Sequence, residues 1–405
     1  MKITHCRNCN EKKLKKLFTL GNLYFTGKFQ KENNKIKRSK IDLNICNKCK
    51  LVQLGHKYNL KYMYGPDYGY RTGINYTMSN HVKNIAKYMS KRAKLKRRDL
   101  VIDIASNDGT LLNYYNKNIV TFGIDPILNK YRKYYKKINF KSSNFFSKNY
   151  VLKKTKRKFK IVTALSVFYD LNNPNKFLKD VYDILDDNGL FLLEFADLAS
   201  LIKYNMFDTI CHEHAEYYST KVLIKIFNKN KFRLITINKS NINGSSKQYL
   251  LSKNTSNFKV ENKKINKILR EESKLKLEDK KTYKKFYRKI VYIKSNLNKF
   301  INKQIKKNKV IHGYGASTKG NTLLQFFNIG KKHINYIADR NPDKFGLKTP
   351  GTKIDIISEI ESRSMLPDFY LVLPWHFQKE IVKREANLMK KGTKLIFPLP
   401  KIKII

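Results

Sequence analysis

The stretch VIDIASNDGTLL, residues 101–112, joins a short apolar run to a turn of small polar residues. The run VIDIA is typical of a strand buried in a parallel sheet, and Thr110 to Leu112 would begin a helix. A strand, a tight turn and a helix in this order form the βα unit of nucleotide-binding α/β domains. An ordinary βα turn that binds no ligand is the alternative.

Two acidic residues indicate which ligand this unit would bind. Asp103 lies within the strand, and Asp125 ends the next apolar run, TFGIDP. A carboxylate at the tip of the second strand is placed to accept hydrogen bonds from ribose hydroxyl groups. The turn has a single glycine and lacks the dinucleotide fingerprint, so it suits a ligand without a pyrophosphate, such as S-adenosylmethionine (SAM).

Further apolar runs extend this unit into a sheet. The third predicted strand ends near Asn144. The fourth spans residues 159–164, and the fifth lies in GLFLLEFA. Strands that alternate with helices form a doubly wound parallel sheet, and its ligands bind at the carboxyl ends of the strands. One crevice should therefore be surrounded by Ser106, Asp125, Ala164 and Glu194.

The chain has 405 residues, enough for two or three domains. No apolar run approaches the roughly 20 residues of a membrane-spanning helix. The N-terminus, MKITHCRNCN, has no apolar signal region. We therefore expect a soluble, cytoplasmic protein that binds no membrane.

The net charge of +54 comes from 85 Lys and Arg against 31 Asp and Glu. Such a charge suits nucleic-acid binding, but the lysines are spread along the whole chain, whereas a binding surface would cluster them. Lys, Asn and Ile also share A/T-rich codons, so a bias in composition explains all three. We expect no specific nucleic-acid partner and only salt-sensitive, non-specific binding to polyanions.

Four of the five cysteines form two CxxC pairs, Cys6/Cys9 and Cys46/Cys49. Two such pairs predict a tetrahedral zinc site. Four thiolates would close the coordination shell, so the metal would be structural. Four unrelated thiols are the alternative, and disulfides are not expected in a cytosolic chain.

The stretch FDTICHEHAEYYS, residues 207–219, places two of the chain's eight histidines beside acidic residues. On an extended strand alternate residues point the same way, so His212 and His214 would share a face. Because histidine titrates near neutral pH, the leading interpretation is a general base held by neighbouring acids. A polar surface segment and a metal clip are the alternatives.

Two other stretches are candidates for binding. The tyrosine-rich loop at residues 61–76 would line a pocket or form a packed aromatic linker. In VIHGYGASTKGNTLL, residues 310–324, glycines would let phosphates approach the N-terminus of a helix. This second stretch begins a smaller α/β domain after long helices in residues 253–308, and the domain would bind substrate or only pack against the first.

Together these segments resemble the three-domain, SAM-dependent sugar C-methyltransferases, which act on nucleotide-linked deoxyketosugars. The segments are the paired CxxC motifs, DYGYRTG, IDIASNDGTLL, CHEHAEYYS, GYGASTKGNTLLQ, DRNPDKFGLKTPGT and LVLPWHF. The resemblance implies an α/β protein with a small zinc-binding domain at 1–65 and a class I, Rossmann-like methyltransferase domain with a helical extension at 66–305. A second, smaller Rossmann-like α/β domain at 306–405 would help to hold the nucleotide sugar.

The resemblance also implies a reaction, in which a base removes a proton next to a ketone and the enolate takes the methyl group of SAM. His214 would be the base, and Glu213 would orient or polarise the reacting groups. His212 and Tyr70 would complete the set of catalytic residues. SAM would contact Asp103, Ala105, Ser106, Asn107, Asp108, Asp125, Asn144, Phe145 and Ala164. The sugar nucleotide would contact Tyr68, Tyr217, Gly315, Ser317, Lys319 and Asn321. We expect this enzyme to be a monomer.

Two positions depart from the family pattern. Cys211 stands where the family has a tyrosine, and Tyr169-Asp170 stands where it tends to have a histidine. A phenol and an imidazole would therefore be missing from the pocket, which leaves the sugar and the methylated carbon open. The alternatives are a zinc-containing RNA methyltransferase, a family member that acts on a non-sugar small molecule, and a SAM-sensing scaffold without activity.

Overall fold

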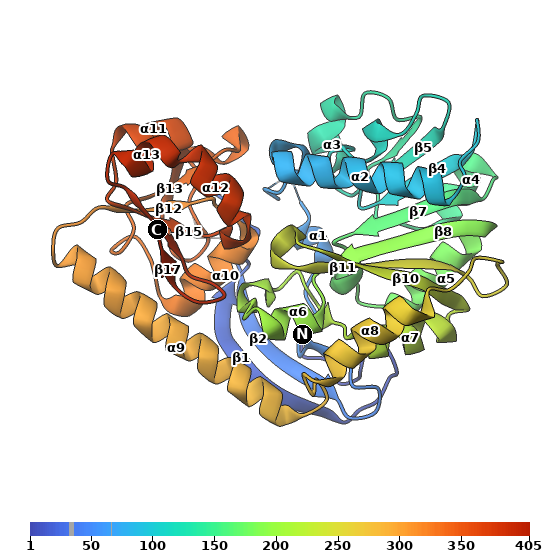
Figure 1. Cartoon of the computed structure of the whole chain (residues 1–405), viewed down its shortest axis with the longest axis horizontal. Helices are drawn as coiled ribbons and strands as arrows, with labels where there is room; N and C mark the ends of the chain where they lie inside the picture. The colour runs from blue at the N-terminus through green and yellow to red at the C-terminus, as the bar shows by residue number, and fades with distance from the viewer. Residues whose placement is uncertain (32–35, 66) are drawn as a thin grey trace.

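The computed structural model describes residues 1–31, 36–65 and 67–405. In these residues the strands form three sheets of four, seven and six strands. Figure 1 shows the seven-stranded sheet at the right, the C-terminal sheet at the left, and strands β1 and β2 between and below them. No helix in the described residues is long and apolar enough to cross a membrane.

The seven-stranded sheet has the order β10-β11-β8-β7-β4-β5-β6. Strands β4 to β8 are parallel, and β10 and β11 join in antiparallel fashion. Helix α2 covers one face, and α5, α7 and α8 cover the other (Figure 1). This confirms the predicted doubly wound sheet, and its strand order reverses between β4 and β7, where ligands bind in such folds. The strands are β4 (Leu100–Ile104), β5 (Val120–Ile124), β6 (Phe140–Ser142), β7 (Phe159–Leu165), β8 (Leu185–Phe195), β10 (Phe232–Ser240) and β11 (Ser246–Lys253).

Local sequence decides where helices of this domain begin and how long they are. Pro174 stands in the first turn of α5, and the side chain of Asn173 accepts a hydrogen bond from Lys176 N there. The helix expected from Thr110 is instead the short 3-10 turn η2 (Leu112–Tyr114), because the sequence NYYN that follows has poor helix propensity. The helices are α2 (Tyr76–Arg92), α3 (Leu128–Tyr131), α4 (Lys148–Thr155), α5 (Pro174–Ile184), α6 (Leu198–Lys203), α7 (Thr220–Lys229) and α8 (Asn262–Ser273).

The N-terminal domain is an antiparallel sheet of β1 (Leu14–Tyr24), β2 (Arg38–Cys46) and β3 (Val52–Leu54). Its fourth strand, β9 (Glu216–Tyr217), comes from far along the chain and pairs with β3. Helix α1 (Leu60–Met63) and the turn η1 (Thr72–Ile74) then lead to the methyltransferase-like sheet. Because β9 directly follows the HEH run, the N-terminal sheet supports that run.

The C-terminal domain has the strand order β14-β13-β12-β15-β16-β17, parallel except for β17. It is the second α/β unit that the sequence predicts. Its strands are β12 (Ile311–Tyr314), β13 (Tyr336–Asp339), β14 (Asp355–Ser358), β15 (Phe369–Val372), β16 (Lys394–Phe397) and β17 (Lys403–Ile404). Its helices are α10 (Thr318–Phe327), α11 (Glu359–Ser364), α12 (Gln378–Arg384) and α13 (Ala386–Lys390).

The long helix α9 (Lys280–Ile305) connects the methyltransferase-like domain to the C-terminal domain and runs along β1 (Figure 1). The rings of Phe18 in β1 and Phe286 in α9 have centroids 5.8 Å apart. One hydrophobic core extends from β1 through α9 into the C-terminal sheet. The remaining 3-10 turns are η3 (Arg132–Tyr134), η4 (Phe168–Asp170), η5 (Phe207–Thr209), η6 (Ile242–Gly244), η7 (Pro342–Lys344) and η8 (Trp375–Phe377).

Candidate active site

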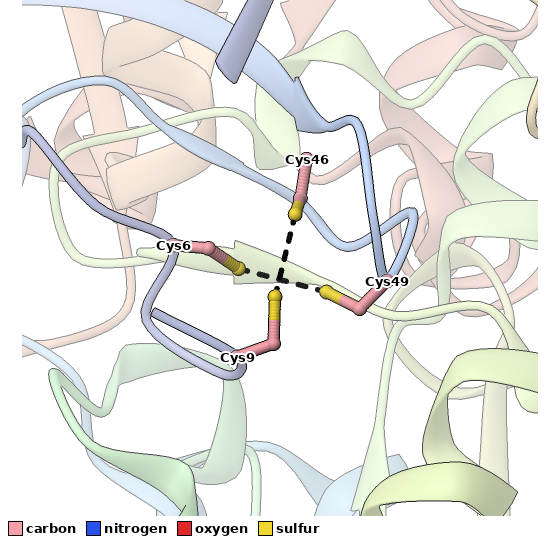
Figure 2. A group of neighbouring side chains, drawn as sticks. All are labelled: Cys6, Cys9, Cys46 and Cys49. Atoms are coloured by element: carbon pink, nitrogen blue, oxygen red, sulfur yellow. Dashed lines mark hydrogen bonds between the residues drawn. The ribbon is translucent and has the colours of Figure 1, made fainter. Parts of the chain in front are cut away.

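The four predicted zinc ligands point toward one another from two turns of the N-terminal domain (Figure 2). Their sulfur atoms all lie within 4.8 Å of one another, with Cys6 3.6 Å from Cys49 and Cys9 3.5 Å from Cys46. Sulfur atoms that bind one zinc ion at about 2.3 Å in tetrahedral geometry lie about 3.8 Å apart. The set therefore fits a structural zinc with no open coordination position.

Contacts around the cysteines tie the zinc site to strand β3. Gln53 Nε2 donates a hydrogen bond to Cys6 Sγ at 3.2 Å, and Arg7 donates to the carbonyl groups of Leu54 and His56 at 2.7 Å each. Leu54 N in turn donates to Ala215 O at 2.8 Å. The zinc site, β3 and the segment that follows the HEH run are thus one connected unit.

The acids predicted to bind SAM lie at the carboxyl edge of the seven-stranded sheet. Asp125 ends β5 and accepts hydrogen bonds from Asn107 N at 2.8 Å and Ile127 N at 2.9 Å. Asp103, within β4, accepts from Thr163 Oγ1 at 2.6 Å. Burial raises the pKa of Asp103 to about 7 and that of Asp125 to about 6. Each oxygen of Asp125 keeps a further lone pair that can accept a hydrogen bond from a hydroxyl group, so this carboxylate suits a ribose.

The turn between β4 and η2 is held by the linker that precedes it. Asn107 Oδ1 accepts from Thr72 N at 2.9 Å, and Asp108 Oδ2 accepts from Gly73 N at 2.8 Å. Ser106 Oγ bonds the hydroxyl of Tyr135 at 2.8 Å. These three side chains therefore shape the turn.

The other residues predicted to contact SAM lie on the same edge. Ala105 adopts a φ of +61°, in the left-handed region. Asn144 and Phe145 are exposed just after β6, and Ala164 is buried near the end of β7. The roles of these residues stay predictions.

The HEH run is a turn and not the extended strand that the sequence analysis expected, so His212 and His214 do not share a face. The ring of His212 stacks on Phe25 of the N-terminal domain, with centroids 4.4 Å apart. The ring of His214 instead packs on Tyr169 at 4.1 Å. The two histidines differ because the turn directs one toward each neighbouring domain, and only His214 faces the methyltransferase side.

His214 has one ring nitrogen available for proton transfer. Its Nδ1 lies 2.6 Å from Thr209 O. A carbonyl oxygen only accepts, so Nδ1 carries the hydrogen and Nε2 keeps a lone pair. Burial, and the positive charge of Lys319, lower the pKa of His214 to about 3. The imidazole is therefore neutral at pH 7.

Glu213 is held by the N-terminal domain. Its carboxylate accepts from Thr26 Oγ1 and from Gly27 N, both at 3.0 Å. A Cβ at Gly27 would lie 2.8 Å from Glu213 Oε1, so a larger residue there would displace the carboxylate from this hydrogen bond. Because both oxygens are bonded to this loop, Glu213 anchors the HEH run.

Tyrosines and an acid fill the space beside His214. Tyr64 of the linker donates a hydrogen bond to Asp170 Oδ2 at 2.5 Å, and its ring packs on Tyr68 at 5.1 Å. Tyr169 supplies a phenol beside His214, whereas position 211, where the family has a tyrosine, carries the thiol of Cys211. The phenol reaches the pocket from the loop after β7. Tyr217 lies buried in β9, and the side chain of Tyr70 is 41% exposed.

The three domains meet around His214, and we call this region the junction. The C-terminal domain contributes the N-terminus of α10 to it. Ser317 caps α10 by accepting from Gly320 N at 3.0 Å, and Asn321 Nδ2 donates to Thr26 O at 2.7 Å. Gly315 has a φ of +81°, and a Cβ there would lie 2.6 Å from Pro374. The protein's own contacts thus occupy the glycine turn that the sequence indicated for phosphates, while Lys319 lies close enough to influence His214.

Several buried polar atoms around this junction have no hydrogen-bond partner within the described residues. Buried polar groups are nearly always bonded, so each of these atoms is open to a hydrogen bond from water or from a bound ligand. Sequence reasoning missed most of them, since no spacing pattern unites residues from four separate loops. The atoms are Asp170 Oδ1, Asp208 Oδ1, Thr209 Oγ1, the hydroxyl of Tyr217 and His376 Nδ1.

Family models match three consecutive parts of the chain. A zinc binding domain matches residues 6–64, a methyltransferase domain 74–237, and a C-methyltransferase C-terminal domain 241–400. These matches show a SAM-dependent methyltransferase. The order of the three matches places the chain in the three-domain C-methyltransferase family, which confirms the resemblance seen in the sequence.

A curated relative agrees with this assignment. The chain is 25% identical to C-methyltransferase NovU of Streptomyces niveus over 368 residues, which is 90% of this chain and 87% of the relative. Among solved structures, a SAM-dependent methyltransferase of Clostridium acetobutylicum is 11% identical, with 43% of this chain and 91% of that chain covered and a TM-score of 0.35. Magnesium protoporphyrin IX methyltransferase of Synechocystis is 14% identical, with 43% and 79% covered and a TM-score of 0.32.

Proposed function

We propose that the protein transfers the methyl group of SAM to a carbon next to the ketone of a nucleotide-linked deoxysugar. The observation that carries this proposal is the position of His214. Its Nε2 has no partner within the described residues, and it lies in a junction of unpartnered polar atoms. A neutral imidazole in such a place suits the removal of a proton from carbon.

His214 Nε2 takes the proton, and the electrons of the broken C–H bond move to the ketone oxygen as an enolate. Bound SAM supplies the methyl group that the enolate carbon takes as S-adenosylhomocysteine leaves. The ketone then re-forms, and His214 releases its proton to solvent. Glu213 holds His214 in place through Thr26 and Gly27. Because a pKa of about 3 makes His214 a weak base, the reaction depends on groups that stabilise the enolate oxygen.

Charged groups next to the linker support a phosphate-containing substrate. A cavity of about 310 Å³ is lined by residues of all three domains, among them Lys31, Lys130 and Lys344 together with the acids Asp67 and Asp343, so ammonium groups outnumber carboxylates there. Lys130 Nζ also donates to Tyr68 O at 2.9 Å, on the tyrosine-rich loop. Ammonium groups attract phosphates, so we assign the nucleotide end of the substrate to this cavity. Tyr68, Tyr217 and Lys319 would face the sugar.

The test is methyl transfer from labelled SAM to a panel of nucleotide-linked 4-ketosugars, with total RNA as a parallel acceptor. We expect label on one sugar. His214→Gln should reduce the rate about 100-fold or more, because a positioned general base contributes about 10²–10⁴-fold. SAM affinity should stay the same. His312→Gln, a buried histidine that bonds Ser362 in the C-terminal domain, is the matched control. Label on RNA alone would contradict the proposal and support the zinc-containing RNA methyltransferase.

A further inference from the structure

Asp170 is a buried carboxyl group next in sequence to the tyrosine that packs on the proposed base. It ends η4, directly after Tyr169, whose ring packs on His214. Asp170 is 6% exposed. Within the described residues its charged neighbours are the acids Glu213 and Glu216, and no cation pairs with it. A carboxylate in this position would be buried without compensation.

The hydrogen bonds of Asp170 are incomplete. Tyr64 donates to Oδ2 at 2.5 Å, whereas Oδ1 is buried and has no partner within the described part of the chain. In a neutral carboxyl group at this position, the oxygen that accepts from Tyr64 is the carbonyl oxygen and the acid hydrogen is on Oδ1. That atom is then a donor without an acceptor among the described residues, and a bound ketone would supply one.

We propose that Asp170, held by Tyr64, donates a hydrogen bond from Oδ1 to the ketone oxygen of the substrate and stabilises the enolate that His214 generates. This role rests on the proposed function. The proton from carbon goes to His214 Nε2, and the electron pair goes to the oxygen bonded by Asp170. When the enolate carbon takes the methyl group, the electron pair of its C=C bond forms the new C–C bond, and the pair on the oxygen re-forms the C=O bond of the ketone. The hydrogen of Asp170 stays on Asp170 throughout.

The surroundings favour the neutral acid. Burial raises the pKa of Asp170 well above its ordinary value, and Glu213 and Glu216 raise it further, while the hydrogen bond from Tyr64 acts in the opposite direction. A carboxylic acid kept neutral by an apolar site can donate to an enolate, and a tyrosine can assist it. The position that interrupts the family pattern therefore gains a chemical role in this chain.

Lys319 is the competing candidate for the same oxygen. Its Nζ already donates to Asn243 O at 3.0 Å, and the negative charge of Asp208 lies nearby. These contacts hold the ammonium group against Asp208 and Asn243 of the methyltransferase domain. Because Asp170 Oδ1 is buried without a partner in the described residues while the ammonium group of Lys319 has one, Asp170 is the residue whose hydrogen bonding a substrate would complete.

Kinetics of three variants test this role. Asp170→Ala should reduce kcat about 100-fold or more with little change in KM, as expected for loss of an oxyanion donor. Asp170→Asn keeps an N–H donor and should be at least about tenfold faster than Asp170→Ala. Asp180→Asn is the matched control, because Asp180 is a buried acid that pairs with Lys176 on α5. Equal rates for Asp170→Asn and Asp170→Ala would overturn the donor role. A loss of kcat in Lys319→Met, with kcat unchanged in both Asp170 variants, would overturn it too.

Infrared difference spectroscopy tests the protonation state without a substrate. The spectrum of wild type minus Asp170→Asn at pH 7 should contain the C=O stretch of a neutral carboxyl group. The spectrum of wild type minus Asp180→Asn should not contain it. Carboxylate bands in the first spectrum would overturn the proposal. Wild-type enzyme that labels no ketosugar overturns the proposed function and this role with it. Active wild type with an equally active Asp170→Ala overturns this role alone.

Discussion

At the residue scale, Ala105 occupies a backbone conformation that suits glycine. Its φ of +61° lies in the left-handed region, where a Cβ costs roughly 1–2 kcal/mol. Ala105→Gly should therefore raise the free energy of unfolding by about 1 kcal/mol, despite the greater freedom of glycine in the unfolded chain.

Urea denaturation measures this effect, and Ala338→Gly is the matched control. Ala338 is a buried residue of the parallel strand β13. It has no positive φ, so glycine there should destabilise the fold by roughly 1 kcal/mol. A loss of stability in both variants would show that the turn carries no strain at Ala105.

His212 has a structural role in our account, in contrast to the catalytic role suggested by the sequence. Burial lowers its pKa to about 4. The unfolded chain has a histidine pKa of about 6.5, so as pH falls through this window the unfolded state gains a proton that the folded state does not bind. Acid therefore weakens the fold, by roughly 3 kcal/mol for this group once pH reaches its folded pKa.

His212→Phe should remove this acid sensitivity and retain methyl transfer. A phenyl ring fits the stacking between Phe25 and Tyr58, whose ring centroids lie 4.4 Å and 5.0 Å from His212. Unfolding free energies at pH 7 and pH 5 for the variant and wild type provide the comparison. The same loss of stability in both proteins, or loss of activity at pH 7, would argue against the structural role.

At the element scale, strand β9 connects the zinc site to the proposed base. Cys6 accepts from Gln53, β3 pairs with β9, and β9 begins two residues after His214. Loss of zinc should therefore loosen the HEH run as well as the N-terminal domain, because zinc binding contributes to folding.

Cys46→Ser tests this connection through hydrogen exchange. We expect loss of bound zinc, a lower Tm, and faster exchange in residues 52–54 and 211–217, with β12 and β13 unchanged. Cys211→Ser, which keeps the zinc ligands, controls for zinc content. Faster exchange confined to residues 1–50 would mean that the zinc domain does not support the HEH run.

Most elements of the two α/β domains could be predicted from the sequence, and the connections between them could not. Short apolar runs such as TFGID and KLIF form buried strands wherever they pair, so their pattern is sufficient. The HEH run was predicted as a strand because alternation alone cannot distinguish an edge strand from a turn. Its true partners, Thr26 and Tyr169, lie far away in the chain, and local patterns carry no information on them.

The same limit applies to the site. The CxxC spacing located the zinc ligands because their geometry is local. The pair of Tyr64 and Asp170 could not be found, because the two residues are 106 positions apart and belong to no motif. Residues that meet only through tertiary packing become visible only when the fold is known.

At the scale of the whole molecule, the net charge of +54 predicts binding to polyanions without specificity. The affinity for RNA should fall steeply with salt, and the logarithm of the binding constant should fall linearly with the logarithm of salt concentration. Two unrelated RNA sequences of equal length should give the same line in a salt titration. A sequence that keeps its affinity at high salt would instead indicate a specific nucleic-acid site.

The central claim is that three domains meet to place His214 next to the acidic carbon of a ketone. Solvent exchange at that carbon tests it most directly, because exchange needs the base and no methyl transfer. In D₂O with S-adenosylhomocysteine bound, the wild-type enzyme should introduce deuterium next to the ketone of its sugar nucleotide, and His214→Gln should not. Equal exchange by both proteins, or methyl transfer by His214→Gln at the wild-type rate, would contradict the account.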